Sequence, residues 1–281
     1  MKLLFIAFAA LSSLLAQDAF QVRVAGHGQP MILIPGLDSG GETWDTTVAH
    51  YQDRFECHVL TVAGFAGVPR VPAPILDRVR DGLADYIRKN NLKKPIIIGH
   101  SLGGFLALAF AVKYPDIPGK LIIVDAYPFM LGASSPYITP EEAKATVVMI
   151  RGGMNRMDQK AYEDYIKAGA GTRTMVTKDS DFQRLVAWGL ASDRTAIADA
   201  TAELFSSDLR DGLDKIKSPT LVLGTWIAYK QYTDHTRTEA NLRRQYARLA
   251  AVEIQVNDTG RHFIMWDDPE WMFGQIDRWV R

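Results

Sequence analysis

The segment Gly99-His100-Ser101-Leu102-Gly103 constrains the fold more than any other part of this chain. An apolar run, 95–98, precedes it, and an Ala- and Leu-rich stretch, 104–110, follows it. This order predicts a strand, a tight turn and a helix, because glycine on both sides of the serine lets the backbone turn sharply. We expect the turn to expose the Ser101 hydroxyl above a sheet, with the next N–H group at a helix N-terminus.

Short apolar segments alternate with longer helical patterns along the chain, which predicts an α/β fold with a parallel sheet and crossover helices. Several segments are apolar without alternation, as in strands that are covered on both faces. The expected helices include 75–90 and 105–113, and the second ends just before Pro115. The expected strands are residues 20–25, 31–34, 57–62, 96–98, 121–124, 220–223 and 252–256.

The strands are closely spaced up to residue 124, after which roughly ninety residues pass before the next one, far more than in an ordinary connection. Residues 128–213 contain apolar and aromatic side chains but no clear strand. We therefore expect a helical cap over the carboxyl edge of the sheet, with Trp188 among the residues that line the substrate pocket. The core would then consist of residues 18–127 and 214–281.

The N-terminus has the pattern of a secretory signal peptide. Lys2 is followed by a short apolar stretch, 3–11, and by small residues near Ala16. The stretch is short for a membrane span. We expect residues 1–17 to direct export, to the periplasm or out of the cell, and the mature chain to have no membrane span.

The charge balance gives no reason to expect a nucleic acid or an anionic membrane as a partner, because 32 Lys and Arg residues balance 32 Asp and Glu residues. We expect a small-molecule substrate instead; the oligomeric state stays open. The single cysteine, Cys57, excludes an intrachain disulfide, and its apolar surroundings in the sequence favour a small buried side chain over a catalytic one.

A serine nucleophile needs a base, usually histidine, to accept its proton. Of the six histidines, His262 is best placed, because it follows the last expected strand and precedes the last helical run. It can reach back over the sheet to Ser101. His100 lies beside the serine and is expected on the pocket floor. The remaining histidines are expected in a hairpin turn (His27), an early helix (His50), a strand (His58) and a polar helix entry (His235).

The acid that orients His262 could be either of two aspartates. Asp125 directly ends the strand 121–124, whereas Asp234 lies about ten residues beyond the strand 220–223 and could instead cap a helix. We favour Asp125, because a functional carboxylate needs rigid support, and keep Asp234 as the alternative.

Two backbone N–H groups are the expected oxyanion hole. One belongs to Leu102, directly after the nucleophile, and the other to Leu37, in the glycine-rich loop that follows strand 31–34. A plain glycine-rich turn is the alternative interpretation of that loop. This chemistry requires neither a metal nor a cofactor, and we expect none.

With these pieces in order, the chain resembles the α/β-hydrolase superfamily. The matching segments are Ile34-Pro35-Gly36-Leu37, Gly99-His100-Ser101-Leu102-Gly103-Gly104 and Gly260-Arg261-His262-Phe263 followed by Asp268-Pro269-Glu270. The resemblance covers the chain from about residue 20 onward and implies a mainly parallel sheet of about eight strands, of which seven are recognisable here. Members commonly carry the acid after the strand 220–223, where this chain has Thr225. Dehalogenase-like members place it at the position of Asp125, but their nucleophile is an aspartate, so Ser101 disfavours halide displacement.

The resemblance implies a serine hydrolase, and we expect an esterase that acts on a small or medium acyl ester through an acyl-enzyme. Acyltransferases, thioesterases and lactonases use the same residues, so they remain alternatives. A ligand-binding protein without catalytic activity is a further alternative, since the usual acid position is lost. The segments that carry the resemblance do not choose the natural substrate.

Overall fold

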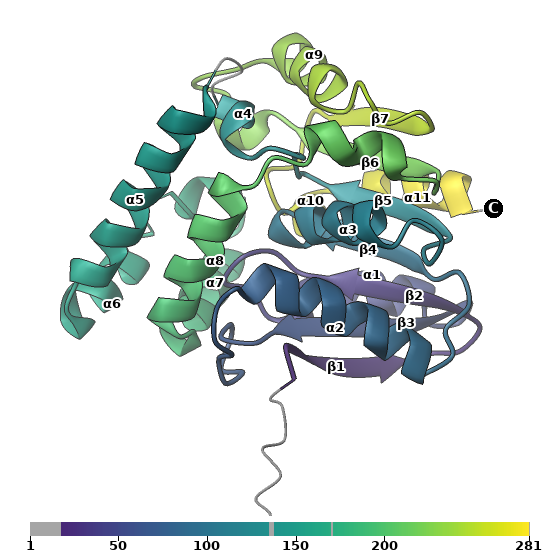
Figure 1. The fold of residues 1–281 in the computed structure, drawn as a ribbon, viewed down its shortest axis with the longest axis horizontal. Coiled ribbons are helices and arrows are strands. Elements are labelled where there is room, and N and C mark those ends of the chain that lie inside the picture. Colours follow the sequence, from purple (N-terminus) through teal and green to yellow (C-terminus); the bar gives the residue numbers. More distant parts are fainter. Residues whose placement is uncertain (1–17, 135–137, 170, 281) are drawn as a thin grey trace, which may run out of the picture.

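The structure is a computed structural model that describes residues 18–134, 138–169 and 171–280. The signal peptide expected over residues 1–17 lies outside the described residues. Seven strands form one sheet in the order β1-β3-β2-β4-β5-β6-β7. All neighbouring strands are parallel, except that β1 runs antiparallel to β3. Strand β4, which leads into Ser101, is therefore the middle strand (Figure 1).

The seven strands expected from the sequence are all present, and six of them extend one or two residues further than expected. They are β1 (Phe20–Ala25), β2 (Gln29–Ile34), β3 (Phe55–Val62), β4 (Ile96–His100), β5 (Lys120–Val124), β6 (Thr220–Thr225) and β7 (Val252–Asn257). Because the sheet is parallel, β2, β4, β5, β6 and β7 end at the same edge, and the loops that follow them meet there.

The turn at His27 does not form the hairpin that its position predicted. It joins β1 to β2, but β3 lies between these two strands and pairs with both of them. The reason is that β3 is buried along almost its whole length and needs a neighbour on each side. Strand β1 is exposed at several positions and occupies the edge.

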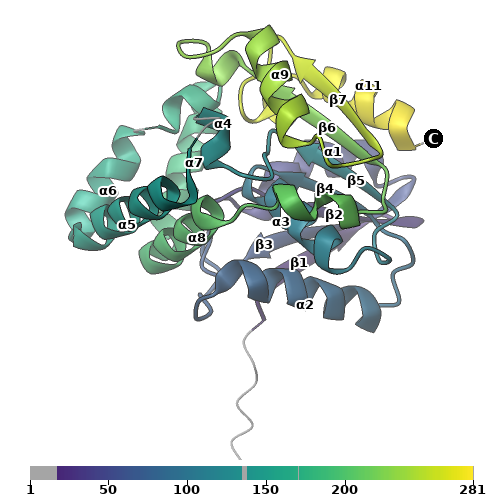
Figure 2. The same cartoon turned by 45° about the horizontal axis from the view of Figure 1, so that its top comes forward.

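Helices cover both faces of the sheet (Figure 2). Alternate residues of each strand point to opposite faces, so Ile32 joins one apolar cluster and Met31 the other. The first cluster includes α2 (Ile75–Lys89), α3 (Leu102–Lys113) and α9 (His235–Gln245), and the second includes α1 (Asp45–Tyr51), α10 (Ile264–Asp267) and α11 (Pro269–Val280).

The sequences of α2 and α3 reflect their different surroundings. Helix α2 buries residues at spacings of three and four, including Ile75, Val79 and Leu83, and exposes its other face. Helix α3 is apolar and small-residue-rich on nearly every side and is buried almost throughout. Its last residue is Lys113, as the following Tyr114-Pro115 predicted.

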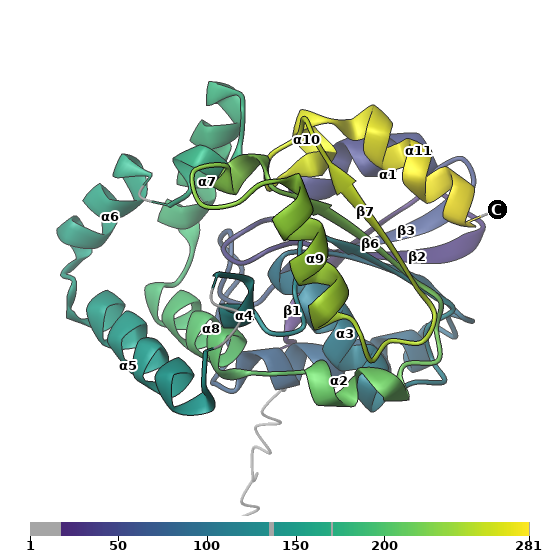
Figure 3. The ribbon, with the colours of Figure 1, turned by 90° about the horizontal axis from the view of Figure 1, so that it is seen from above.

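The insertion between β5 and β6 contains the helices α4 (Leu131–Ser134), α5 (Pro140–Arg156), α6 (Gln159–Ala168), α7 (Asp179–Ala191) and α8 (Arg194–Ser206). They lie beside the sheet as a cap (Figure 3). A capping box of Thr139 and Glu142 begins α5, and Asp158 and Asp193 cap α6 and α8. Short 3-10 turns occur at Gly41–Trp44, Arg173–Met175, Arg210–Lys215 and Ile227–Tyr229. None of the described helices is both long and apolar enough to cross a lipid bilayer.

Candidate active site

Ser101 occupies a strained turn between β4 and α3. Its φ is 53°, in the left-handed region that residues with a side chain rarely adopt. The flanking glycines are required by close backbone approach: a Cβ at Gly99 would lie 2.2 Å from the Gly103 carbonyl oxygen, and one at Gly103 would lie 2.2 Å from the Ile34 carbonyl oxygen. Ser101 lines the main cavity of the described residues. This is the tight turn that the glycine spacing predicted.

His262 and Asp125 form a buried pair at the same edge of the sheet. The His262 Nδ1 lies 2.6 Å from Asp125 Oδ2, and the two residues are 6% and 4% exposed. Asp125 follows β5 directly, and the Thr225 N–H group donates to its other oxygen, Oδ1, at 3.2 Å. An ionised Asp125 accepts the Nδ1 proton and so leaves the His262 Nε2 free to act as a base.

Asp234, the alternative acid, has a different partner in the structure. Its side chain accepts a hydrogen bond from the Arg237 N–H group and caps α9. It also forms an ion pair with the Arg237 side chain, and it is not among the residues that line the cavity. The geometry therefore brings Asp125 rather than Asp234 to His262.

The His262 loop is held by residues that were not singled out from the sequence. The Asn257 Oδ1 accepts hydrogen bonds from the N–H groups of Thr259 and Gly260, and the Thr225 hydroxyl donates to the Gly260 carbonyl. Thr225 thus supports both Asp125 and the histidine loop. Its position at the end of a strand was the only sign in the sequence that Thr225 would contact the site.

His100 packs directly against His262. The two ring centroids are 4.5 Å apart, and the His100 Nε2 lies 3.0 Å from the His262 carbonyl oxygen, to which it donates. Burial and, secondarily, the neighbouring His262 lower the pKa of His100 well below its usual range. His100 is therefore neutral, lines the cavity as expected, and fixes the backbone of the histidine loop.

The two expected oxyanion-hole donors belong to segments that adjoin Ser101. Leu102 is the first residue of α3, and Leu37 lies in the loop after β2. That loop touches the serine turn, because a Cβ at Gly36 would be 3.3 Å from the Ser101 Cβ. Within the described part of the chain, neither amide donates a hydrogen bond to a protein acceptor. Both donors are thus available to a ligand.

Ser101 makes no side-chain hydrogen bond to His262 within the described residues, although both line the cavity. Serine and base often tighten only when the substrate is bound.

The cavity above Ser101 has a volume of about 1310 Å³ and is formed by both core and cap. Most of its lining is apolar, and it includes the five methionines Met130, Met149, Met154, Met157 and Met175. Methionine is flexible and polarizable, so such a lining adapts to ligands of different shapes. The cavity is larger than a typical small-molecule pocket of roughly 300–1,000 Å³.

Trp188 does not line this cavity, contrary to the expectation from the sequence. Its ring packs near Trp266, with centroids 5.9 Å apart, and close to the Gly40 backbone. Leu185 and Val186 of the same helix line the cavity, and Trp188 is turned by about 60° from the first and about 160° from the second, to the flank that faces Trp266. Helix phase therefore directs Trp188 toward the core.

The other histidines have partners away from Ser101. His50 contacts Asp277, His58 lies between Glu56 and Tyr86, and His235 contacts Asp258. Cys57 is buried, and burial raises the pKa of its thiol to about 11, which makes it unreactive. No group of three or more potential metal ligands occurs in the described ranges.

A sequence model described as "Alpha/beta hydrolase family" matches residues 31–275. Among curated proteins, the human (Lyso)-N-acylphosphatidylethanolamine lipase is 30% identical over 112 residues, which are 38% of this chain and 33% of that protein. The pimeloyl-[acyl-carrier protein] methyl ester esterase of Vibrio cholerae is 29% identical over 106 residues, covering 38% of this chain and 40% of that one. The chain thus spans a third to two-fifths of these relatives.

Solved structures match over almost the whole chain. A hydrolase from Oleispira antarctica has a TM-score of 0.76 at 14% identity and covers 94% of this chain and 96% of its own. An esterase from Exiguobacterium antarcticum has a TM-score of 0.73 at 17% identity, with 93% and 95% covered. At these identities the likeness shows the shared fold.

Proposed function

The chain belongs to the alpha/beta hydrolase family, and on that premise we propose that it is a serine hydrolase that cleaves carboxylic esters through an acyl-enzyme. The main support for this proposal is the buried hydrogen bond between the His262 Nδ1 and Asp125, next to the strained turn that presents Ser101. The names of two relatives, a lipase and a methyl ester esterase, also support an ester as the substrate class.

In the proposed first step, the Ser101 Oγ attacks the ester carbonyl carbon while His262 Nε2 accepts the hydroxyl proton. Asp125 stabilises the resulting imidazolium through the Nδ1–H bond. The negative charge that develops on the carbonyl oxygen is bound by the Leu37 and Leu102 N–H groups, which have no other acceptor in the described chain.

The tetrahedral intermediate then collapses: the bond to the alcohol oxygen breaks, and His262 gives its proton to the leaving alcohol. In the second half, His262 removes a proton from water, whose oxygen attacks the acyl carbon. Release of the carboxylic acid returns the proton to Ser101. The proton balance closes over the cycle without any group outside these residues and water.

A fluorophosphonate probe with mass-spectrometric mapping tests this proposal. We expect covalent labelling of Ser101, loss of labelling in Ser101→Ala, and a fall in p-nitrophenyl ester hydrolysis by several orders of magnitude in that variant. Ser218→Ala is the matched control, since Ser218 is a buried serine outside the cavity lining whose hydroxyl donates to the Pro118 carbonyl. A folded wild-type protein that binds ligands tightly but is not labelled would instead be a non-catalytic binder.

We also propose export of the protein, from the pattern of residues 1–17. Expression of the full chain in a bacterial host, followed by N-terminal sequencing of the periplasmic or secreted fraction, tests this. Cleavage after Ala16 or Gln17 is the expected result; an intact N-terminus in the cytoplasmic fraction would contradict it.

A further inference from the structure

A carboxyl group that the proposed mechanism does not use lies on the wall of the cavity. Asp38 follows Leu37 directly and lines the cavity above Ser101. The residue as a whole is partly buried, but its Oδ1 atom is shielded from solvent and has no hydrogen-bond partner in the described residues. Leaving a buried polar atom unpaired costs about 1–3 kcal/mol. A ligand that donates a hydrogen bond would remove this cost.

The described residues supply no donor to the Asp38 Oδ1, although a side-chain hydrogen bond from Ser192 to the carboxyl group lowers its pKa in part. Its Oδ2 lies against α7, where a Cβ at Gly189 would be 3.1 Å away. The nearby Ser192 hydroxyl donates its proton to the Trp188 carbonyl at 2.8 Å. No ion pair involves Asp38 in the described ranges. Loss of hydration therefore raises the pKa of Asp38 to about 7, which Ser192 offsets only in part.

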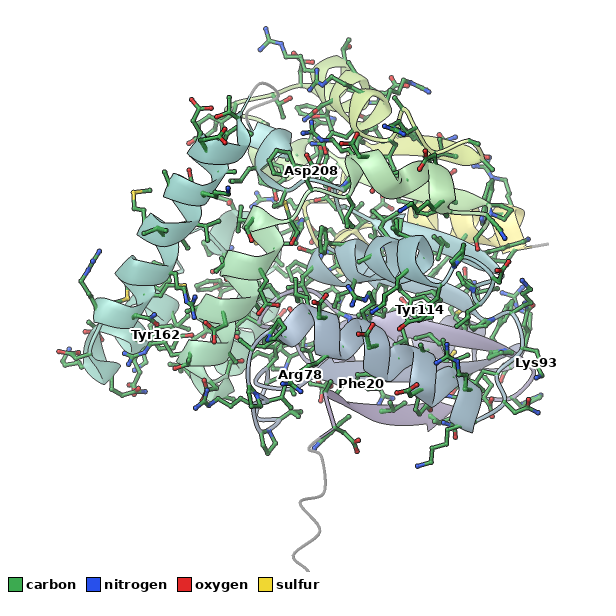
Figure 4. All side chains as sticks on the ribbon, viewed as in Figure 1. Phe20, Arg78, Lys93, Tyr114, Tyr162 and Asp208 are labelled. Carbon is green, nitrogen blue, oxygen red and sulfur yellow. The ribbon has the colours of Figure 1, made fainter. Side chains whose placement is uncertain are left out.

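A second unpartnered polar atom faces the same cavity from the cap. Tyr162 of α6 is 2% exposed, lines the cavity, and has a buried hydroxyl without a partner in the described residues. Figure 4 labels it on the cap. Asp38, from the core loop after β2, and Tyr162, from the cap, thus line the same cavity, and the charge of Asp38 is among the causes that raise the pKa of Tyr162.

We propose that Asp38 and Tyr162 form a polar subsite that binds a hydroxyl group of the substrate, a few bonds from the scissile carbonyl. This inference rests on the proposed ester hydrolysis. A hydroxyl fits both residues, because it donates to the Asp38 Oδ1 and accepts from the Tyr162 hydroxyl, whereas an ammonium group cannot accept. The natural substrate is then a hydroxylated ester rather than a plain fatty ester.

The expected position of the hydroxyl follows from the chain path. Gly36 touches Ser101, and Asp38 is two residues further, at most about 7 Å along an extended backbone. Because Asp38 belongs to the loop that touches Ser101, the substrate hydroxyl is expected within several bonds of the carbonyl carbon. It can lie on the acyl side or on the alcohol side of the ester, and the test includes both.

The test compares hydroxylated with plain esters of equal length. The acyl pairs are p-nitrophenyl hexanoate against its 3-hydroxy and 5-hydroxy derivatives, and the alcohol pair is butyl against 4-hydroxybutyl butanoate, followed by pH-stat. We expect wild type to prefer at least one hydroxylated ester about tenfold or more in kcat/KM. Asp38→Gly, which tolerates the φ of 58°, should abolish this preference, and Tyr162→Phe should reduce it.

Asp181→Asn is the matched control. Asp181 is also a buried aspartate with an unpartnered oxygen, but it is not among the cavity-lining residues, so its substitution should leave the preference unchanged. Asp38→Asn keeps an acceptor oxygen and should retain part of the preference. The subsite would be overturned if Asp38→Gly lowered kcat/KM equally for hydroxylated and plain esters, or if wild type had no preference for hydroxylated esters.

Binding separates the subsite from the proposed hydrolysis. Calorimetric titration of Ser101→Ala with ethyl 3-hydroxyhexanoate, ethyl 5-hydroxyhexanoate, 4-hydroxybutyl butanoate and their plain counterparts measures recognition without turnover. A hydroxyl preference that depends on Asp38, in a wild-type protein that hydrolyses no ester, would retain the subsite and reject the hydrolase. The opposite outcome is that wild type hydrolyses esters while Ser101→Ala binds hydroxylated and plain esters equally, with or without Asp38→Gly. That result would reject the subsite and retain the hydrolase.

Discussion

The carboxyl edge of the sheet and the cap are built in different ways. At the sheet edge, Ser101 and Asp125 follow their strands directly, and the serine turn is held by backbone contacts that leave no room for a Cβ at Gly99 or Gly103. On the cap side, helices contribute flexible methionines to a cavity of about 1310 Å³ that core and cap enclose together. From this difference we expect the core to carry the proposed reaction, and the cap together with Asp38 to influence which ester is bound.

The largest expected effect is at the acid. Asp125→Asn should lower kcat for a p-nitrophenyl ester by about 10⁴-fold, because Asn no longer holds the His262 tautomer and charge. Asp234→Asn should stay within about twofold, since Asn also caps a helix well. Steady-state kinetics on both variants measure this. A large loss confined to Asp234→Asn would transfer the acid role away from the sheet edge.

The next effect tests how rigid the core turn is. Gly103→Ala should reduce the free energy of unfolding by about 4 kcal/mol or more, because its Cβ would overlap the Ile34 carbonyl oxygen. Gly274→Ala, in the middle of α11 with open space around it, should stabilise by up to about 1 kcal/mol. Urea unfolding measures both, and equal stability of the two variants would contradict the close approach.

Asp38, at the boundary between the two regions, should make the stability of the protein depend on pH. Its pKa of about 7 in the folded protein exceeds the ordinary value of 3.8, so the native state binds more protons than the unfolded chain between these values. Stability should therefore fall as pH rises from about 4 to 7, by at most about 4 kcal/mol from this group.

Asp38→Asn lacks this titration. The melting temperature of Asp38→Asn minus that of wild type should therefore increase as pH rises through the same window. Calorimetry at pH 4.5, 6 and 8 measures this difference. A constant difference between the two proteins across that range would show that Asp38 is hydrated and ionises normally.

The smallest effect lies in the cap. Met154→Ala enlarges the cavity and should raise the ratio of kcat/KM for p-nitrophenyl decanoate over butanoate by about three- to tenfold. Val148→Ala, an exposed position on the same helix outside the cavity lining, should leave the ratio unchanged. A change in overall rate without a change in the ratio would mean that Met154 supports the core reaction rather than substrate choice.

The sequence by itself determined the strands, the serine turn and the histidine loop, because each depends on local features: apolar runs, flanking glycines, and position after a strand. It also favoured Asp125 over Asp234 for a local reason, direct attachment to a strand. The structure, in which His262 lies 2.6 Å from Asp125, is in keeping with that preference.

Only the tertiary structure decided the features that depend on contacts between distant segments. The placement of β3 between β1 and β2 follows from its need for two neighbours, and the phase of α7 turns Trp188 away from the cavity. The burial of the Asp38 Oδ1 without a partner likewise depends on α6 and α7, which lie more than a hundred residues further along the chain than Asp38. Apolar runs predicted the burial of strands and of Cys57, but the burial of a polar side chain such as Asp38 depends on the assembled core and cap.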